Sequence, residues 1–280
     1  MLQRKWLRLR YSFDRMVAGK APRIAYLHIP KCGGTTIFHH FKSNLGNSKS
    51  GKAVHFDSEA FARFDDAALE TARRAQFVSG HFGWNALCAV GAGAIQFTTL
   101  RDPFKRLRSL YSFSRSKAHS AKPLFAATFE AAKQRSFGDF CLSPEPEVRM
   151  MIDNAMTRTL ADDYACDKAW DHDTTLRAAM RNLDRLDLVI DLDDLNAEMP
   201  RICQISRTRL VRGQPNQNVT PPSDLRLMSR DEFESDVWLH KLIAQDEKLY
   251  HHAFGPRRSR GEPADINEPE MTNDVRRFGS

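Results

Sequence analysis

Residues 28–36 read His-Ile-Pro-Lys-Cys-Gly-Gly-Thr-Thr, and these residue types suit a loop that binds an anion. Gly33 and Gly34 can adopt a positive φ and let the backbone approach an anion closely. The hydroxyl and backbone N–H groups of Thr35 and Thr36 can bond to phosphate oxygens. A helix that begins here would add the free N–H groups and the dipole of its N-terminus. The segment therefore indicates a phosphate-binding loop.

Lys31 precedes the two glycines, and this order separates the loop from the Walker A motif. In that motif the lysine follows the last glycine and is itself followed by Ser or Thr. Lys31 still brings a mobile positive charge to the loop. Taken alone, the segment fits a phosphate loop and an ordinary Gly-Gly turn with a surface lysine equally well.

A second group of anion-binding residue types follows the apolar run 95–100. Arg101 stands directly after that run, and an Asp-Pro pair then predicts the start of a helix. We expect Arg106 and Ser109 to share one face of this helix, because residues at i and i+3 are neighbours on a helix surface. Arginine can bind a phosphate through two parallel hydrogen bonds. Taken alone, however, the segment is more typical of a solvated basic helix.

The elements that position these segments follow from the apolar pattern. Buried strands are predicted over 24–29, 76–79, 95–100 and 186–190. Helices are predicted over 35–45, 61–75, 103–117, 125–133, 146–160, 195–205 with a break at Pro200, and 231–254. This alternation predicts an α/β fold with a mostly parallel, P-loop-like sheet that helices cover on both faces. Ligands of such sheets bind at the carboxyl ends of the strands, where both segments lie.

Length and charge bound the organisation of the chain. The 280 residues suffice for one large α/β domain, which we place at 21–254, and the formal charge of +7 suits an anionic partner. Residues 1–20 form a basic N-terminal arm with a possible weak membrane-surface contact, although an ordinary arm is the commoner interpretation. Residues 255–280 are polar and predict a disordered tail. Since no apolar run of about 18 residues and no signal-peptide core occurs, we expect a cytoplasmic protein.

The five cysteines are scattered, and no CxxC pair or Cys/His cluster occurs in the sequence. This pattern argues against a disulfide framework and against a zinc site. We therefore expect reduced thiols and no metal site.

Taken together, the two segments resemble the sulfotransferase superfamily, especially its carbohydrate branch. Residues 30–36 are similar to its 5′-phosphosulfate loop, and residues 101–111, with the pattern Arg-Asp-Pro-x-x-Arg-x-x-Ser-x-Tyr, to its 3′-phosphate motif. The Ser-Gly-His at 79–81 is similar to the Gly-His pair of heparan and uronyl 2-O-sulfotransferases. Those enzymes usually have His-Gly-His, so only His81 matches their base. Residues 153–158 and 216–220 resemble the family more weakly.

The resemblance implies a sulfotransferase fold and a donor, 3′-phosphoadenosine 5′-phosphosulfate (PAPS), with no metal. It implies that the sulfuryl group moves to a hydroxyl of a carbohydrate or glycoconjugate, with His81 as the base. Lys31 would stabilise charge on the leaving nucleotide. The residues implied to bind the donor are Lys31, Cys32, Gly33, Gly34, Thr35, Thr36, Arg101, Ser109 and Asn218.

Several alternatives stay open at this level. His81 can instead be a buried structural histidine, with His55 as a minor candidate at the acceptor site and His28 as a structural residue. Weaker candidates for the base are Glu130, Asp139 and Glu147. Candidates for contact with an acidic saccharide are Arg149, Arg158 and the arginines from 201 to 212, and Trp84 is a candidate for stacking on a sugar ring.

Two other classes of function compete with sulfuryl transfer. A P-loop kinase or NTPase would need a lysine after the glycines. A non-enzymatic module for nucleic acid or an anionic membrane would need scattered basic residues with interleaved aromatics. The positive charge here accompanies two phosphate-type segments, so we expect no nucleic-acid partner. The acceptor and the oligomeric state are not determined by the sequence.

Overall fold

The computed structural model describes residues 21–46, 52–57, 65–116, 123–163, 171–210 and 227–255. The predicted arm, almost all of the predicted tail and Asn218 lie outside these ranges. In the described ranges, no helix combines the length and the apolar character that crossing a bilayer would require.

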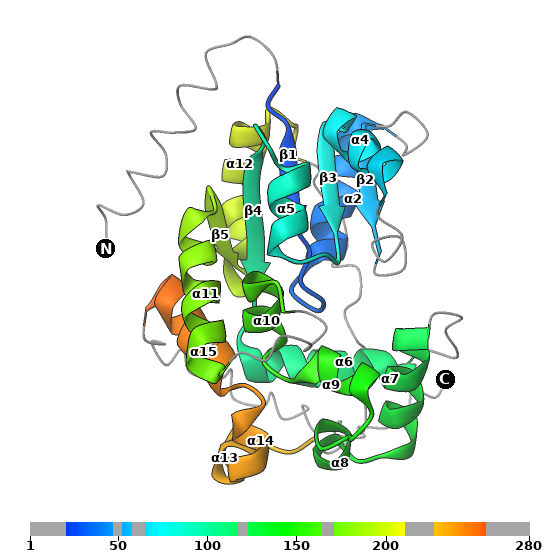
Figure 1. The fold of residues 1–280 in the computed structure, drawn as a ribbon, viewed down its shortest axis with the longest axis vertical. Helices are drawn as coiled ribbons and strands as arrows, with labels where there is room; N and C mark the ends of the chain where they lie inside the picture. The colour runs from blue at the N-terminus through cyan, green and yellow to red at the C-terminus, as the bar shows by residue number, and fades with distance from the viewer. Residues whose placement is uncertain are drawn as a thin grey trace, which may run out of the picture.

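Five parallel strands form one sheet with the order β2-β3-β1-β4-β5, as Figure 1 shows. The strands are β1 (Ile24–Leu27), β2 (Ala53–Phe56), β3 (Phe77–Gly80), β4 (Ile95–Leu100) and β5 (Leu188–Asp191). This arrangement confirms the predicted parallel α/β sheet. Strand β2 is not among the predicted strands, because it is an edge strand of four residues with a histidine in its middle.

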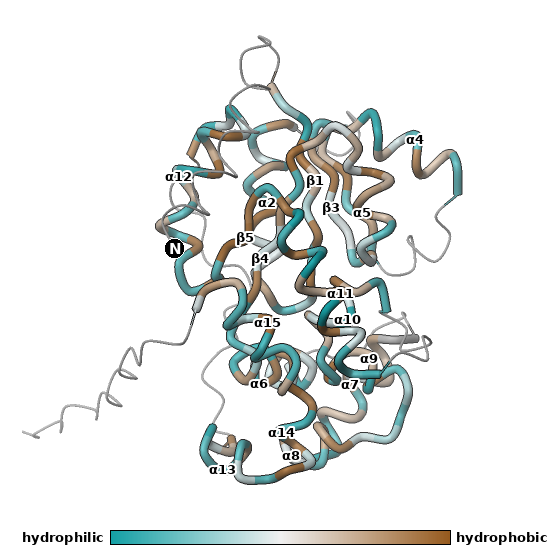
Figure 2. Tube along the Cα trace, turned by 60° about the vertical axis from the view of Figure 1, so that its left-hand side comes forward, coloured by the Kyte–Doolittle hydropathy of each residue, from teal (hydrophilic) through white to brown (hydrophobic). Residues whose placement is uncertain are grey.

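Helices cover both faces of the sheet, as predicted (Figure 2). On one face lie α2 (Gly34–Leu45) and α12 (Leu195–Ser206), whose apolar residues pack with Tyr26 and Phe97 of the strands. On the other face, Leu27 and Val78 pack with helices that the sequence pattern only partly predicted. These helices are α4 (Asp66–Arg74), α5 (Trp84–Val90), α10 (Ala155–Ala161), α11 (His172–Arg185) and α15 (Ala244–Phe254).

A second apolar core lies beyond the carboxyl ends of the strands, in the lower half of Figure 1. It is built from α6 (Pro103–Ser116), α7 (Pro123–Gln134), α8 (Phe137–Cys141), α9 (Pro146–Ile152), α13 (Arg230–Ser235) and α14 (Val237–Lys241). Phe104 and Phe233 meet at its centre, with ring centroids 5.3 Å apart. This helical core faces the carboxyl ends of the strands, across from the turn that follows β1.

Two predicted helices are divided in the structure. The helix expected over 146–160 breaks at Asn154, which has a φ of 45°. Its side chain bonds to the carbonyl of Lys241 and to the N–H of Gln245, at 2.9 Å each, and so ties the break to the C-terminal helices. The helix expected over 231–254 is divided twice, at Asp236 and again at 242–243. The carboxylate of Asp236 accepts the N–H of Trp238 at 2.8 Å.

The break predicted at Pro200 is wrong, because α12 continues through this residue. Proline removes the hydrogen bond to the carbonyl of the residue four positions earlier, here Asn196. Both residues are exposed. Solvent can therefore bond the freed carbonyl, and the helix is retained.

Candidate functional site

The turn between β1 and α2 forms a cradle that leaves no space for side chains at its glycines. Gly33 has a φ of +84°, and a Cβ atom there would lie 2.3 Å from Cδ1 of Leu192. A Cβ on Gly34 would lie 1.8 Å from Cδ2 of His28. Lys31 also has a positive φ, of 67°. The chain therefore turns sharply into α2 and presents the N-terminus of this helix to the space beyond the strand.

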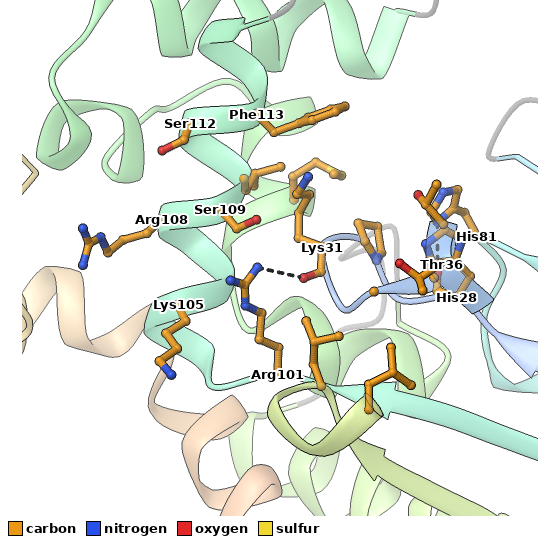
Figure 3. Close-up of a pocket in the computed structure, with 18 of the residues that line it drawn as sticks. His28, Lys31, Thr36, His81, Arg101, Lys105, Arg108, Ser109, Ser112 and Phe113 are labelled. Atoms are coloured by element: carbon orange, nitrogen blue, oxygen red, sulfur yellow. Dashed lines mark hydrogen bonds between the residues drawn. The ribbon is translucent and has the colours of Figure 1, made fainter. Parts of the chain in front are cut away.

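A cavity of about 690 Å³ opens in front of this turn, between the carboxyl ends of the strands and α6. Eight of the predicted site residues line it (Figure 3), and they are Lys31, Gly33, Gly34, Thr35, Thr36, His81, Arg101 and Ser109. The structure thus brings together segments from the ends of β1, β3 and β4. The prediction for Asn218 falls on a residue outside the described ranges.

Cys32 belongs to the turn but does not line the cavity. Its side chain is fully buried, with Sγ 3.8 Å from Sδ of Met156. Burial raises the pKa of this thiol to about 12, so it is protonated at neutral pH. Its side chain fills space beneath the loop, as a packing residue does.

Arg101 lies at the end of β4 and points toward the turn. Its Nη1 donates to the carbonyl of Lys31 at 3.4 Å (Figure 3). Its Nε is buried and has no hydrogen-bond partner among the described residues. Burial lowers the pKa of Arg101 from its usual value. An arginine pKa nevertheless stays far above neutrality, so the site holds a largely buried positive charge.

Arg106 and Ser109 both lie in the single helix α6, three residues apart as expected, but Arg106 does not line the cavity. Arg106 is fully buried and donates through Nη2 to the carbonyl of Met151 at 3.0 Å, on α9. The cavity is lined instead by Lys105 and Arg108, which the sequence analysis missed. The basic run on α6 was visible in the sequence, but only the packing of α9 decides which of its members turns inward.

Three histidines gather at the carboxyl ends of β1, β2 and β3. Nδ1 of His81 lies 2.9 Å from the carbonyl oxygen of His28, and the two rings are 4.2 Å apart. Because a carbonyl oxygen only accepts, Nδ1 of His81 carries the proton in this contact, which leaves the lone pair on Nε2. His55 lies 5.4 Å from both rings. Burial, followed by the charges of His81, His55 and Lys31, lowers the pKa of His28 well below its usual value.

Lys31 reaches from the turn across the cavity to α6 (Figure 3). Its Nζ lies 3.7 Å from the centroid of the Phe113 ring, a cation–π contact. The lysine therefore spans the space between the phosphate-type turn and the helical wall.

The weaker sequence candidates lie elsewhere. None of the three proposed acidic bases lines the cavity. Arg149 pairs with Asp153 at 3.0 Å, and Arg158 pairs with Asp163 at 2.8 Å. Trp84 is buried against the sheet. These residues serve packing and ion pairing in the described structure.

A family model described as Sulfotransferase family matches residues 14–206. The chain belongs to the sulfotransferase family. A comparison with curated proteins gives no match. Sulfotransferases of this family are PAPS-dependent transferases, and this membership decides against a P-loop kinase and against a non-enzymatic module.

The sulfotransferase cavity suits a donor with separate anionic groups. The turn at Gly33 and Gly34 is a cradle that any side chain would fill. Arg101 keeps a buried Nε without a partner in the described part of the chain. A nucleotide with a phosphosulfate at one end and a second phosphate would meet a helix N-terminus and a guanidinium.

Proposed function

We propose that this sulfotransferase moves the sulfuryl group of PAPS to a hydroxyl of a carbohydrate or glycoconjugate, with His81 as the general base. The position of His81 beside the cradle, with its Nδ1 bonded to the carbonyl of His28, carries this proposal most directly. The proposal includes a likeness to the heparan and uronyl 2-O-sulfotransferases, which is supported only by the Gly-His pair at 80–81. A cytoplasmic location remains a prediction from the sequence.

Two elements would hold the donor. The turn from Gly33 to Thr36 would bind the 5′-phosphosulfate through backbone N–H groups and the hydroxyls of Thr35 and Thr36. Arg101 and Ser109 would bind the 3′-phosphate, since both line the same cavity from the end of β4 and from α6. The buried Nε of Arg101, which finds no hydrogen-bond partner in the described part of the chain, supports this role. A contribution from Asn218 stays a prediction.

The base would act through one nitrogen. Since Nδ1 of His81 donates to a carbonyl, its Nε2 has the lone pair that can accept the proton of the acceptor hydroxyl. When bound, PAPS supplies the sulfuryl group, and its bridging oxygen leaves with the electron pair of the broken S–O bond. The deprotonated acceptor oxygen forms the new S–O bond.

Lys31 would neutralise the charge that develops on the leaving oxygen. Its ammonium group contacts Phe113 in this structure. The four-carbon stem is flexible, so the group can turn from the ring toward an anion in the cradle. A positive charge at this place lowers the barrier by favouring the charge distribution of the transition state.

The helical wall favours an acceptor with both polar and apolar surface. Arg108 offers a positive charge, and Phe125 and Phe129 offer aromatic faces in the same cavity. Aromatic rings pack against apolar faces such as those of sugar rings. Because Arg149 and Arg158 are engaged in ion pairs, contact with an acidic saccharide would fall to Arg108.

Calorimetry with the product nucleotide tests donor binding. We expect 3′-phosphoadenosine 5′-phosphate to bind the purified chain, and ATP and adenosine 5′-phosphosulfate to bind at least about tenfold more weakly, because they lack the 3′-phosphate. Arg101→Ala should abolish this preference, whereas Arg74→Ala, an exposed control on α4, should keep it. A folded protein that prefers ATP would contradict the donor assignment.

An acceptor screen tests the transfer itself. Labelled PAPS is incubated with uronic-acid-containing and neutral saccharides, and the sulfated products are identified by mass spectrometry. We expect transfer to a saccharide hydroxyl by the unmodified chain and by the exposed control His251→Ala. Transfer only to non-saccharide alcohols or phenols would overturn the acceptor class.

A further inference from the structure

The three histidines at the carboxyl ends of β1, β2 and β3 form a cluster that the catalytic proposal does not explain. In the parallel register, Leu27 pairs with Gly80, so His28 and His81 follow at the same level of β1 and β3. His55 of β2 pairs with Ser79 of β3. Side chains in a strand alternate between faces, so the register turns all three rings to the same face of the sheet. We call His28, His55 and His81 the histidine cluster.

The nitrogen atoms of this cluster are close enough for one ion. One ligand atom from each residue lies within 4.8 Å of the other two. Zinc–nitrogen bonds of 2.0–2.1 Å in a tetrahedral site require nitrogen atoms about 3.3 Å apart. A bound ion would therefore draw the nitrogen atoms together from separations of up to 4.8 Å by rotation of the rings. The cluster holds imidazoles without a carboxylate, which favours Zn²⁺, Ni²⁺, Co²⁺ or Cu²⁺ over Mg²⁺ or Ca²⁺.

Hydrogen bonds in the cluster resemble those that orient metal-binding histidines. Such residues usually donate one ring N–H to a backbone carbonyl, a carboxylate or water. Nδ1 of His81 donates to the carbonyl of His28 at 2.9 Å, and Nδ1 of His55 lies 2.8 Å from the hydroxyl of Ser79. In both rings Nδ1 is the nitrogen that makes the orienting contact.

His28 supplies an independent observation. The residue is only 8 % exposed, and its Nδ1 has no hydrogen-bond partner among the described residues. A buried polar atom without a partner costs free energy. Its ring lies against both other rings of the cluster. A bound cation would give this nitrogen the partner that it lacks.

We propose that the histidine cluster binds one divalent transition-metal ion and that the bound ion holds the sulfotransferase inactive. The ion would bond to the lone pair of His81 that the proposed base uses to accept a proton, so the two functions exclude each other. The inhibitory part rests on the proposed function of His81. The metal site itself does not.

Metal binding is tested on the full chain after removal of metals with a chelator. Titration with Co²⁺ should produce the visible absorption bands of a nitrogen-bound ion, and calorimetry with Zn²⁺ should give one site per chain. His55→Ala should weaken Zn²⁺ binding at least about tenfold, because a lost ligand should cost no less than a lost outer-shell partner. His251→Ala, an exposed control on α15, should bind as the unmodified chain does.

His55→Gln provides a second variant if His55→Ala fails to fold, with near-ultraviolet circular dichroism as the test of folding. Equal Zn²⁺ affinity in the folded variants and the unmodified chain would overturn the site. So would the absence of Co²⁺ bands in a folded, chelator-treated protein.

Sulfation assays test the inhibitory part separately. We expect Zn²⁺ to inhibit transfer from PAPS and a chelator to restore it, with the midpoint of inhibition in His55→Ala raised by the same factor as the dissociation constant. Bound Zn²⁺ without inhibition would overturn inhibition and retain the site. Absence of any transfer would count against the proposed function, while the Co²⁺ spectrum would still report on the cluster.

Discussion

Nδ1 of His81 donates to the backbone carbonyl of His28 at 2.9 Å, so the first strand of the sheet sets the tautomer of a ring that follows the third. Leu27 and Gly80 are paired in the parallel ladder immediately before these residues, and this pairing holds the contact in place. The proton-accepting nitrogen of His81 is therefore positioned by a backbone carbonyl at the end of a strand and not by another side chain.

His81→Asn separates the base from the binding of the donor. The Asn amide can still donate to the carbonyl of His28 but cannot accept a proton near neutral pH. We expect kcat to fall by about 10²–10⁴-fold. The affinity for 3′-phosphoadenosine 5′-phosphate should change by less than about threefold, because the donor-binding groups are intact. Calorimetry and initial rates check both values, and a kcat near that of the unmodified chain would exclude His81 as the base.

Gly34→Ala should damage the cradle. The added Cβ would lie 1.8 Å from Cδ2 of His28, so either the ring or the helix start must move. Overpacking of this kind costs about 1–3 kcal/mol of unfolding free energy. We expect lower stability in urea and nucleotide binding weaker by about tenfold or more, since the helix N-terminus shifts. Gly138→Ala meets only a flexible Met228 terminus at 3.3 Å and is the matched control. Equal binding by both variants would contradict the cradle.

Cys32 should resist alkylation although it lies in the donor loop. Burial raises the pKa of its thiol to about 12. At pH 8 the Cys32 thiol is then in its reactive thiolate form in only about one molecule in ten thousand. Among the cysteines of the described ranges, Cys88 is partly exposed and the others are buried, so Cys88 should be labelled first of these four by iodoacetamide. Peptide mass mapping of native and unfolded protein measures the order, and rapid native labelling of Cys32 would show that the loop opens.

Arg230→Ala should destabilise the start of α6. Asp102 accepts the N–H of Lys105 at 2.9 Å and pairs with Arg230, and its side chain is only 4 % exposed. Loss of the guanidinium leaves a buried carboxylate without this cation, at a cost of about 2 kcal/mol, less than for a fully buried pair. Arg74→Ala breaks an exposed pair with Glu70 and should cost less than about 0.5 kcal/mol. Urea unfolding distinguishes the two, and equal costs would contradict the role of Asp102.

His40 should contribute to acid destabilisation. This residue of α2 is buried, and burial lowers its pKa in the folded chain. The unfolded chain therefore binds a proton more readily, and stability is lost as the pH falls below about 6.5. His40→Gln removes the titrating group but can still bond to Thr208. Its thermal midpoint should fall less between pH 7 and pH 5.5 than that of the unmodified chain. An equal fall would assign the effect to other groups.

The sequence by itself determined the features that depend on neighbouring residues. Continuous apolar runs predicted β1, β3, β4 and β5, because a buried parallel strand needs apolar residues on both faces. The Gly-Gly-Thr-Thr turn and the Arg-Asp-Pro helix start were visible in the sequence because glycine frees the backbone locally and proline restricts it. The family resemblance depended on these two local segments.

Only the tertiary structure decided how separate segments face each other. Arg106 turns inward because the carbonyls of α9 receive it, and nothing within α6 distinguishes it from Arg108. The histidine cluster forms because β3 lies between β1 and β2 in a register that pairs His55 with Ser79. Each strand bonds to segments distant in the sequence, so no single segment specifies that register. The residues of the cluster were readable from the sequence, but their proximity was not.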